Sequence, residues 1–476
     1  MADRRPLVLD VDGTFLRTDM LYESFWAGLG SAPVATILAS LRHLNDPATL
    51  KAKLHDIAPI RADLLPVNGE IAALAQGARE EGREIMLASA SDWRLVKAVS
   101  DHHGFDGALG SAPGENLKGP TKAEVLNNEF GAGGYLYAGD SRADMPIWEQ
   151  ASYSIVVGRA GGAAAKLKAA GKGVTELAGG WRMLALMKAI RPHQWVKNVL
   201  LLLPMIAAHN ADMMTFMAVL LGIVAFSAAA SSIYVVNDLL DLEADRLHPT
   251  KCRRPFASGA VPIRVGMLTF VLLAALAIGI AFSLGTAFLG VILLYMLLSL
   301  SYSLKLKRMR WVDIFTLATL YTLRVVAGAA ASGVDASVYM LIFIFPVFVS
   351  LGCVKRLTEL TLATSDERLP GRGYGRADRG DLLNVAGLGM VGALVIFFLY
   401  SFSAQAVALY PKQWILWLAL LPVGGWLLRM IRLGYLGKQD YDPIVFAIKD
   451  IRGIGLLLLT LALMLYAAGL GPDWLF

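Results

Sequence analysis

Three aspartates that follow a long apolar run have a spacing that suits metal and diphosphate chemistry. Asp238, Asp241 and Asp245 stand at helical positions i, i+3 and i+7, so one helix would present three carboxylates on one face. Such carboxylates repel one another unless a cation lies among them, and Mg²⁺ takes carboxylate oxygens together with substrate phosphates. A basic cluster that could hold outer phosphate oxygens follows: Lys251, Arg253 and Arg254. The stretch predicts a site for Mg²⁺ and a diphosphate, oriented by Asn237; a hydrated helix end with mixed charges is the alternative.

A second set of acidic residues lies near the N-terminus. Asp10 and Asp12 end an apolar strand that begins at Leu7, and strand alternation puts both carboxylates on one side, at the end where open α/β sheets place their chemistry. Other chemically active side chains belong to later elements: Ser89 at the end of strand 84–89, Lys122 at the start of a helix, and Asp140 and Asp144 at the end of a strand from residue 135. A strand at 152–158 would complete this sheet.

These motifs resemble those of the haloacid dehalogenase (HAD) phosphohydrolase superfamily, over residues 5–175. The resemblance implies that Asp10 is the nucleophile and Asp12 the general acid/base. It further implies that Ser89 and Lys122 bind the phosphoryl group, and that Mg²⁺ is held by three carboxylates: Asp10, Asp140 and Asp144. Helices at 21–29, 33–44 and 48–57 correspond to the small cap that this superfamily inserts, here near 19–83. A degenerate, non-catalytic HAD domain is the alternative.

The chain is too long for one ordinary domain, and its composition changes along its length. Of the 476 residues, 56% are hydrophobic, and apolar runs dominate from about residue 196. About nine transmembrane helices are expected, near 197–209, 213–236, 266–283, 286–304, 312–331, 337–353, 385–404, 413–430 and 454–470. The net charge of +6 lies mostly in short loops between these spans, so we expect a lipid bilayer and no nucleic acid as partner.

Loop charge predicts the topology. Basic residues gather in alternate loops, around 251–254, 305–310, 355–379 and 429–452, whereas the opposite side carries essentially Lys412 alone. No signal peptide precedes the first strand, so the N-terminal domain and both active sites are expected in the cytoplasm, on a multi-pass protein of the bacterial inner (plasma) membrane. The two cysteines, Cys252 and Cys353, do not suggest a disulfide framework.

Polar residues at or inside the predicted helix ends are further candidates for substrate binding. Ionisable groups at membrane depth are costly and usually face a bundle interior. The candidates are Lys197, Asn198, Tyr302, Lys305, Lys307, Arg324, Lys355, Arg356 and Glu359. Arg324 could instead be a structural arginine bound to helix-end carbonyls, and Lys305 and Lys307 could serve topology alone.

Together these features resemble the UbiA-type intramembrane prenyltransferase superfamily, most closely its decaprenyl-phosphate phosphoribosyltransferase branch, over residues 185–476. The residues that carry the likeness include the stretches 191–198, 237–255, 302–307 and 355–359, with Asp442, Pro443 and Asp450. Aromatic prenyltransferases of the superfamily carry a second aspartate-rich motif, where this chain has a basic segment with the single aspartate Asp313. That departure favours phosphoribosyl diphosphate and a polyprenyl phosphate as substrates.

The expected architecture is an α/β HAD-like Rossmannoid phosphatase domain with a helical cap (residues 1–178), a linker or interfacial helix (179–196), and an all-α membrane transferase domain (197–476). We expect transfer of 5-phosphoribosyl to a polyprenyl phosphate, with Asp238 and Asp241 essential, and removal of the 5-phosphate by the HAD domain, giving polyprenyl-phosphoribose for envelope glycan synthesis. Alternatives are an aromatic prenyltransferase using a polyprenyl diphosphate, a phosphatase with a membrane anchor, and a transporter. The chain length of the lipid and homo-oligomer formation stay open.

Overall fold

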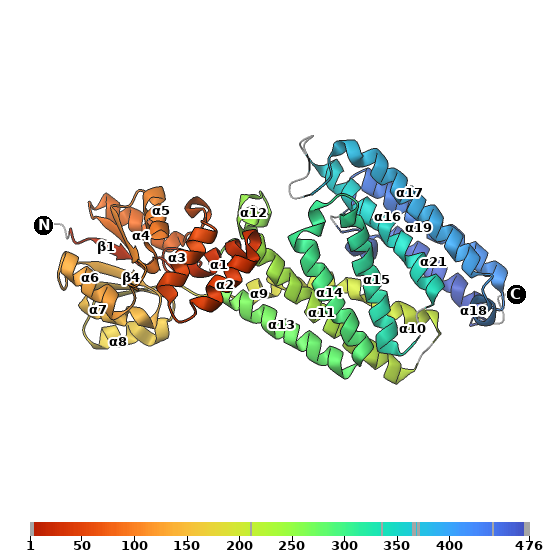
Figure 1. Ribbon diagram of the computed structural model, residues 1–476, viewed down its shortest axis with the longest axis horizontal. Helices are drawn as coiled ribbons and strands as arrows, with labels where there is room; N and C mark the ends of the chain where they lie inside the picture. Colours follow the sequence, from red (N-terminus) through yellow and green to blue (C-terminus); the bar gives the residue numbers. More distant parts are fainter. Residues whose placement is uncertain are drawn as a thin grey trace. The chain divides into compact units, whose positions relative to one another are not determined.

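The computed structural model of the protein describes residues 4–209, 212–334, 337–363, 368, 372–439 and 442–470. The chain folds into two compact units. Unit 1 combines Met1–Ile190 with Tyr234–Val271, and unit 2 combines Arg191–Ile233 with Leu272–Phe476. The first part of unit 1 is an α/β domain, whereas unit 2 is helical (Figure 1).

The α/β domain is built on a parallel six-stranded sheet. The strands are β1 (Leu7–Leu9), β2 (Ile85–Asp92), β3 (Gly107–Ser111), β4 (Leu136–Gly139), β5 (Tyr153–Val157) and β6 (Val174–Leu177), in the order β3-β2-β1-β4-β5-β6. The order reverses at β1, which pairs with β2 on one side and with β4 on the other. Open α/β sheets form their ligand crevice at such a switch point, at the carboxyl ends of the strands.

Helices cover both faces of this sheet. Those of the domain are α1 (Met20–Ser31), α2 (Pro33–Arg42), α3 (Pro47–Ile57), α4 (Gly69–Glu80), α5 (Trp93–His103), α6 (Pro120–Phe130), α7 (Met145–Gln150), α8 (Ala163–Ala169) and α9 (Met183–Ala189). Strand alternation sends Leu7 and Leu9 into a core with α4 and α5, and sends Val8 into a second core with α6 to α8. The helices α1 to α3 pack on one another, apart from these two layers (Figure 1).

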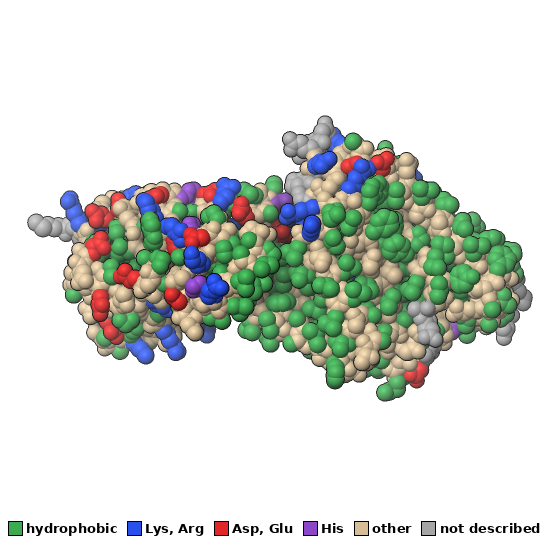
Figure 2. Space-filling view, viewed as in Figure 1, with side chains coloured by type: hydrophobic (Ala, Val, Ile, Leu, Met, Phe, Trp, Pro, Cys, Tyr) green, Lys and Arg blue, Asp and Glu red, His purple; other side chains and the backbone are tan. Residues whose placement is uncertain are grey.

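Seven helices are long and apolar enough to cross a membrane, among the residues that the structure describes. They are α11 (Met213–Leu240), α13 (Ile263–Ser283), α14 (Thr286–Leu304), α15 (Val312–Ser332), α16 (Val338–Leu362), α17 (Arg379–Tyr400) and α19 (Gln413–Tyr435). Shorter helices are α10 (Leu203–Ala207), α12 (Leu242–Leu247), α18 (Ala404–Leu409), α20 (Pro443–Lys449) and α21 (Ile451–Ala467). Figure 2 shows hydrophobic side chains dominating the surface of the long helices.

Two of the nine expected spans differ from the rest. The segment expected at 197–209 is a 3-10 helix, η4 (Pro192–Leu202), followed by α10, which has Pro204 in its first turn. A Cβ on Gly328 of α15 would stand 2.1 Å from the Leu201 carbonyl oxygen, so η4 lies with its backbone directly against α15. The last expected span is α21, an apolar helix of 17 residues. The two-part fold class predicted from the sequence is nevertheless confirmed: a parallel α/β domain followed by a polytopic helical region.

Candidate functional site

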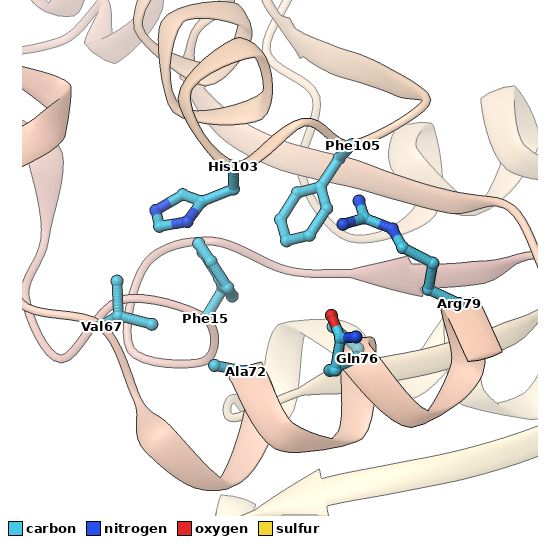
Figure 3. Close-up of a pocket in the computed structure, with 8 residues that line it drawn as sticks. Phe15, Val67, Ala72, Gln76, Arg79, His103 and Phe105 are labelled. Atoms are coloured by element: carbon cyan, nitrogen blue, oxygen red, sulfur yellow. The ribbon is translucent and has the colours of Figure 1, made fainter.

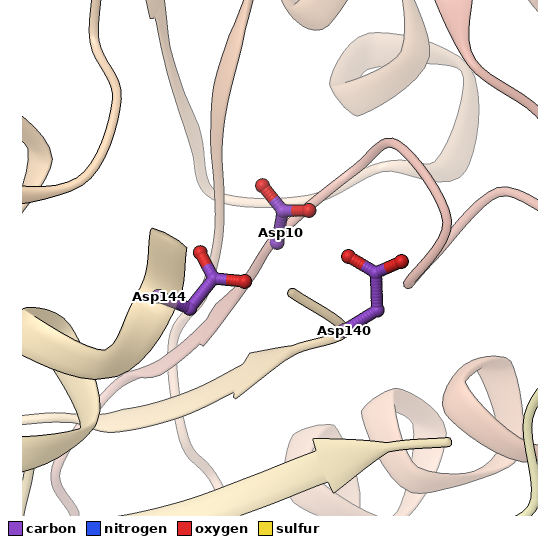
Figure 4. A group of neighbouring side chains, drawn as sticks. All are labelled: Asp10, Asp140 and Asp144. Carbon is purple, nitrogen blue, oxygen red and sulfur yellow. The ribbon is translucent and has the colours of Figure 1, made fainter. Parts of the chain in front are cut away.

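Three carboxylates meet at the switch point of the sheet. Asp10 follows β1, Asp140 follows β4, and Asp144 ends the 3-10 turn η2 (Arg142–Asp144). Each offers an oxygen that lies within 4.8 Å of the others (Figure 4). Hard oxygen ligands at this separation fit Mg²⁺, the cation expected from the sequence. The residues present therefore fit a bound Mg²⁺.

Lys122 supplies the positive charge next to this triad. Its ammonium group is buried and donates to Asp10 Oδ1 at 2.6 Å, to the Ala88 carbonyl at 3.1 Å and to the Tyr137 hydroxyl at 3.0 Å. Tyr137 in turn donates to Asp144 at 3.0 Å. This tyrosine belongs to β4 and escaped the sequence analysis, because its alternation with Leu136 and Ala138 looks like that of an ordinary core strand.

Burial raises the pKa of two of these carboxyl groups, Asp10 and Asp140. Burial raises the pKa of Asp10 well above its ordinary value, although the charge of Lys122 acts in the opposite direction. Burial, with the charge of Asp144 next in size, raises the pKa of Asp140 to about 7, and Arg264 at the start of α13 partly offsets this. A cation that binds here would therefore relieve carboxylate repulsion.

Asp12 is held by three donors beside the triad. The Ser89 and Ser91 hydroxyls donate to Asp12 Oδ2 at 3.0 and 2.6 Å, and the backbone N–H of Met20 donates to Oδ1 at 2.8 Å. The predicted phosphoryl-binding Ser89 thus contacts the predicted general acid/base, and Ser91 is an additional partner. Gly13 must stay small: its φ is +81°, and a Cβ there would stand 2.3 Å from Asp140 Oδ2.

The cap contributes its own groups to this part of the domain. The Lys51 ammonium, on α3, donates to the Ala90 carbonyl, between the two serines. Asp19 caps α1 by accepting from the Leu21 N–H at 2.9 Å. Burial, with the charge of Asp12 next in size, raises the pKa of Asp19 to about 7.

A cavity of about 290 Å³ lies elsewhere, beside Phe15 (Figure 3). Its lining is mainly apolar and aromatic: Phe15, Val67, Ala72, Ala75, Gln76, Arg79, His103 and Phe105. Phe15 packs edge-on against His103 at 4.9 Å and against Phe105 at 5.2 Å between ring centroids. None of the proposed chemical groups lines this cavity.

Asp238 lies in the last turn of α11, whereas Asp241 and Asp245 come after it, so the three aspartates do not share the expected single helix. The chain leaves the helical conformation at Asp241, between α11 and α12, although the N–H of Asp245 still donates to the Asp241 carbonyl at 2.8 Å. Arg254 binds both flanking aspartates, with Nη1 at 3.2 Å from Asp238 Oδ1 and 2.7 Å from Asp245 Oδ2. Among the described residues, these aspartates do not form a carboxylate group as close as that around Asp10.

Further polar groups lie around these aspartates. Asn237 Oδ1 is buried and has no hydrogen-bond partner among the described residues. Asp238 and Asp245 are almost completely buried, and an arginine already bridges them. Lys251 and Arg253 are exposed in and around a short 3-10 turn, η5 (Lys251–Arg253). The predicted residues 237–254 therefore form a compact polar segment of unit 1.

A buried ion pair joins this segment to the cap. Arg246, on α12, donates to both carboxylate oxygens of Glu23 on α1, at 2.5 and 3.0 Å, and to the Ala257 carbonyl at 3.0 Å. Glu23 also accepts from the Thr18 hydroxyl at 2.6 Å. The sequence could not reveal this pair, because 223 positions separate its members.

The remaining candidates lie in unit 2, and most of them form three groups. Lys197 pairs with Asp442, whose Oδ2 is also 4.0 Å from the Lys355 ammonium. Asn198 accepts from Arg324 Nε at 3.1 Å, and Arg324 also donates to the Leu320 carbonyl at 2.6 Å. The last group is centred on Arg356.

The Arg356 group contains more partners than the sequence indicated. Arg356 is fully buried and binds Asp313 through Nε and Nη2, at 2.5 and 2.8 Å. Its other contacts are with Tyr302, at 3.0 Å, and with Glu359. Carboxylates thus occupy much of this arginine's hydrogen-bonding capacity. Lys305 is exposed and Lys307 half-buried around the 3-10 turn η6 (Leu306–Arg308), and no described contact joins Lys305 to this network.

These features define a polytopic membrane protein joined to an α/β domain that carries the HAD motifs at one site. A family model for the UbiA prenyltransferase family matches residues 198–449. The chain belongs to the UbiA prenyltransferase family, as the sequence motifs indicated.

Two relatives extend the comparison. The chain is 35% identical over 461 residues to the uncharacterized protein y4nM of Sinorhizobium fredii, covering 94% of this chain and 88% of that protein. It is 36% identical over 235 residues to the decaprenyl-phosphate phosphoribosyltransferase of Mycobacterium tuberculosis, covering 48% of this chain and 72% of that protein. The resemblance to this branch is thereby confirmed.

Solved structures resemble each part separately. A UbiA homolog from Archaeoglobus fulgidus, bound to GPP and Mg²⁺, has 15% identity and a TM-score of 0.45, and covers 60% of this chain and 99% of its own. A HAD family hydrolase from Salmonella enterica has 14% identity and a TM-score of 0.25, and covers 32% of this chain and 63% of its own.

Proposed function

We propose that the protein is a bifunctional membrane enzyme that makes a lipid-linked pentose. Its membrane part transfers 5-phosphoribosyl from phosphoribosyl diphosphate to a polyprenyl phosphate, and its HAD domain removes the 5-phosphate. The observation that carries the proposal is the presence in unit 1 of two acidic sites, the Asp10 triad and the 237–254 segment. Similarity to a decaprenyl-phosphate phosphoribosyltransferase supports the first reaction.

In the transfer step, an oxygen of the polyprenyl phosphate forms a bond with C1 of the ribose. The bond from C1 to the diphosphate breaks, and diphosphate leaves with the electron pair. The proposed roles are that Asp238, Asp241 and Asp245 hold Mg²⁺ and that Asn237 orients the diphosphate. Arg254 would then shift from its carboxylate partners to phosphate oxygens, together with Lys251 and Arg253.

In the hydrolytic step, a carboxylate oxygen of Asp10 attacks the phosphorus of the 5-phosphate. The ribose oxygen leaves and takes a proton from Asp12, and Asp12 then takes a proton from the water that releases phosphate from Asp10. Lys122 holds the Asp10 carboxylate and offers charge to the phosphoryl oxygens. Bound Mg²⁺ would cancel the repulsion between the nucleophile and the phosphate dianion.

We further propose that both sites face the cytoplasm of a bacterial inner membrane, because the basic loops gather on one side. The product would then serve as a pentose donor for envelope glycans. Its ribosyl 5-phosphate precursor stays in the plane of the membrane, so attachment of the phosphatase to the transferase raises its local concentration.

The test uses purified protein in lipid with Mg²⁺, phosphoribosyl diphosphate and polyprenyl phosphate, and follows lipid products by mass. Wild type should give lipid-linked ribose, Asp10→Asn its 5-phosphate form, and Asp241→Asn neither. Asp101→Asn is the matched control, because Asp101 is an exposed aspartate outside both sites. A prenylated aromatic product, with indifference to phosphoribosyl diphosphate, would refute the proposal in favour of an aromatic prenyltransferase.

A further inference from the structure

Helix α2 of the cap exposes an apolar face to its surroundings. Val34, Leu38 and Leu41 are 70%, 60% and 63% exposed, and Ile37 is 47% exposed. They lie at the helical spacing i, i+3, i+4 and i+7, and so form one stripe, which Leu44 extends beyond the helix end. We call these five residues the α2 face.

The α2 face is unusual for a helix in an α/β domain. Within Pro33–Arg42 the only charged residue is Arg42, at the last position. The buried residue of α2 is Thr36, which meets Gly28 of α1, so the leucines and the isoleucine are turned away from the rest of the cap. Contiguous exposed apolar residues of this kind mark a surface that contacts another apolar phase or partner.

The position of α2 identifies that phase. A Cβ on Gly30, near the end of α1, would stand 3.9 Å from the carbonyl oxygen of Leu240, the last residue of the membrane-span candidate α11. The Glu23–Arg246 pair holds α1 to α12, directly after α11. The turn that leads into α2 therefore lies at the end of a membrane helix. In Figure 2, hydrophobic side chains gather over the part of the domain where Figure 1 labels α1 and α2.

We propose that the α2 face lies in the interfacial layer of the bilayer that α11 spans. A helix of 10 residues is about 15 Å long, too short to cross the hydrocarbon core but suited to lie in its surface. Helix α9 precedes the membrane part and exposes Met183, Leu184 and Met187, which gives unit 1 a second apolar helix for the same layer.

This placement bears on the substrate class, and here the inference rests on the proposed function. Helix α2 packs against α1 and α3, and α3 carries Lys51, which contacts the Ala90 carbonyl beside the serines that hold Asp12. Insertion of α2 would hold the cap side of the phosphatase site at the level of the lipid headgroups. A phosphate on a lipid-linked sugar lies at that level, whereas a free sugar phosphate gains nothing from it.

The first experiment measures the depth of the α2 face in full-length protein in phosphatidylcholine nanodiscs. A single cysteine replaces Leu38 in a Cys252→Ser, Cys353→Ala background and carries an environment-sensitive fluorophore. A matched control places the cysteine at Lys97, an exposed position on α5. We expect doxyl-labelled lipid to quench the label at position 38 and not the label at position 97. Equal quenching of both labels by aqueous iodide, with none by the lipid, would overturn the proposal.

Two further arms separate the remaining outcomes. Quenching at position 38 that depends on the number of protein copies per disc would assign the α2 face to a second copy of the chain, and would also overturn the proposal. The double variant Leu38→Asp, Leu41→Asp should slow phosphate release from the lipid-linked sugar phosphate by about tenfold or more, while p-nitrophenyl phosphate hydrolysis stays unchanged. If wild type hydrolyses neither compound while position 38 lies in lipid, the proposed function fails and the membrane contact of α2 stands.

Discussion

The buried pair between Glu23 and Arg246 allows a sharp test of how unit 1 is held together. The two side chains are 3% and 8% exposed and share two hydrogen bonds. The substitution Arg246→Met keeps the bulk of the side chain and removes its charge. Among the described residues, the substitution leaves the buried Glu23 with the Thr18 hydroxyl as its one partner, and removal of one member of a buried pair costs about 3–5 kcal/mol.

The expected consequence is local opening of α1 and α12. Since each 1.4 kcal/mol corresponds to about tenfold, a loss of about 3 kcal/mol raises the open population on the order of 100-fold. Hydrogen exchange followed by mass spectrometry, on protein in nanodiscs, reports this population for peptides from both helices. The double variant Glu23→Gln, Arg246→Met should recover most of the protection, because no unpaired charge is then buried.

An exposed pair in the same domain provides the control. Lys168 and Glu176 lie 2.6 Å apart, with side chains 54% and 53% exposed. Such a pair contributes about 0.2–1 kcal/mol, so Lys168→Met should change exchange by about fivefold at most. If Arg246→Met changes exchange no more than this control, or if its effect adds to that of Glu23→Gln without coupling, the reasoning from burial is wrong.

Three further predictions concern the two parts of the chain. The pKa of Asp140 is raised from 3.8 to about 7, so between these two pH values the folded protein keeps a proton that the unfolded chain releases. The free energy of unfolding of the metal-free protein should therefore fall as the pH rises from about 4 to about 7. Unfolding measured in EDTA and in Mg²⁺ should show that Mg²⁺ makes this decline smaller. Gly13→Ala should abolish phosphate release and spare transfer, because the alanine Cβ would collide with Asp140. The control is Gly114→Ala, at a similar φ but with open space around the new Cβ, which should leave both activities intact. Arg324→Met should lower the thermal stability of the membrane part, since the buried Asn198 oxygen loses a donor at a cost of about 1–3 kcal/mol; an unchanged melting temperature would contradict this reasoning.

Local patterns in the sequence were sufficient to predict which carboxylates of the α/β domain lie close together. Asp10 and Asp140 each directly follow a strand, and parallel strands bring their carboxyl ends to one edge of the sheet, so the two carboxylates are expected to lie close together. Apolar runs likewise predicted seven long helices at nearly their observed positions. Both patterns depend on neighbours within a few residues.

Features that depend on distant partners could not be predicted in this way. The helical register of Asp238, Asp241 and Asp245 assumed one continuous helix, but the helix is interrupted at Asp241 and Arg254 bridges the outer two. Similarly, Lys197 and Lys355 share Asp442, which comes from a loop far along the chain. Asp442 was named only among the residues that carry the family likeness, and its partners could not be predicted. The apolar run at 197–209 predicted a transmembrane helix, but this segment begins as a 3-10 helix. Its backbone packs closely against α15 because Gly328 has no side chain.

Unit 1 is discontinuous in sequence, since Tyr234–Val271 joins Met1–Ile190. A polypeptide cut between Gly180 and Trp181 would therefore lose a peptide bond but none of the surface that holds α1 to α12. Two fragments, 1–180 and 181–476, should recognise each other when they are expressed separately, and the affinity of this split pair would measure the strength of the interface directly. Conversely, the isolated fragment 1–180 should expose Glu23 without its arginine, so its solubility and stability would understate those of the same residues in the whole chain.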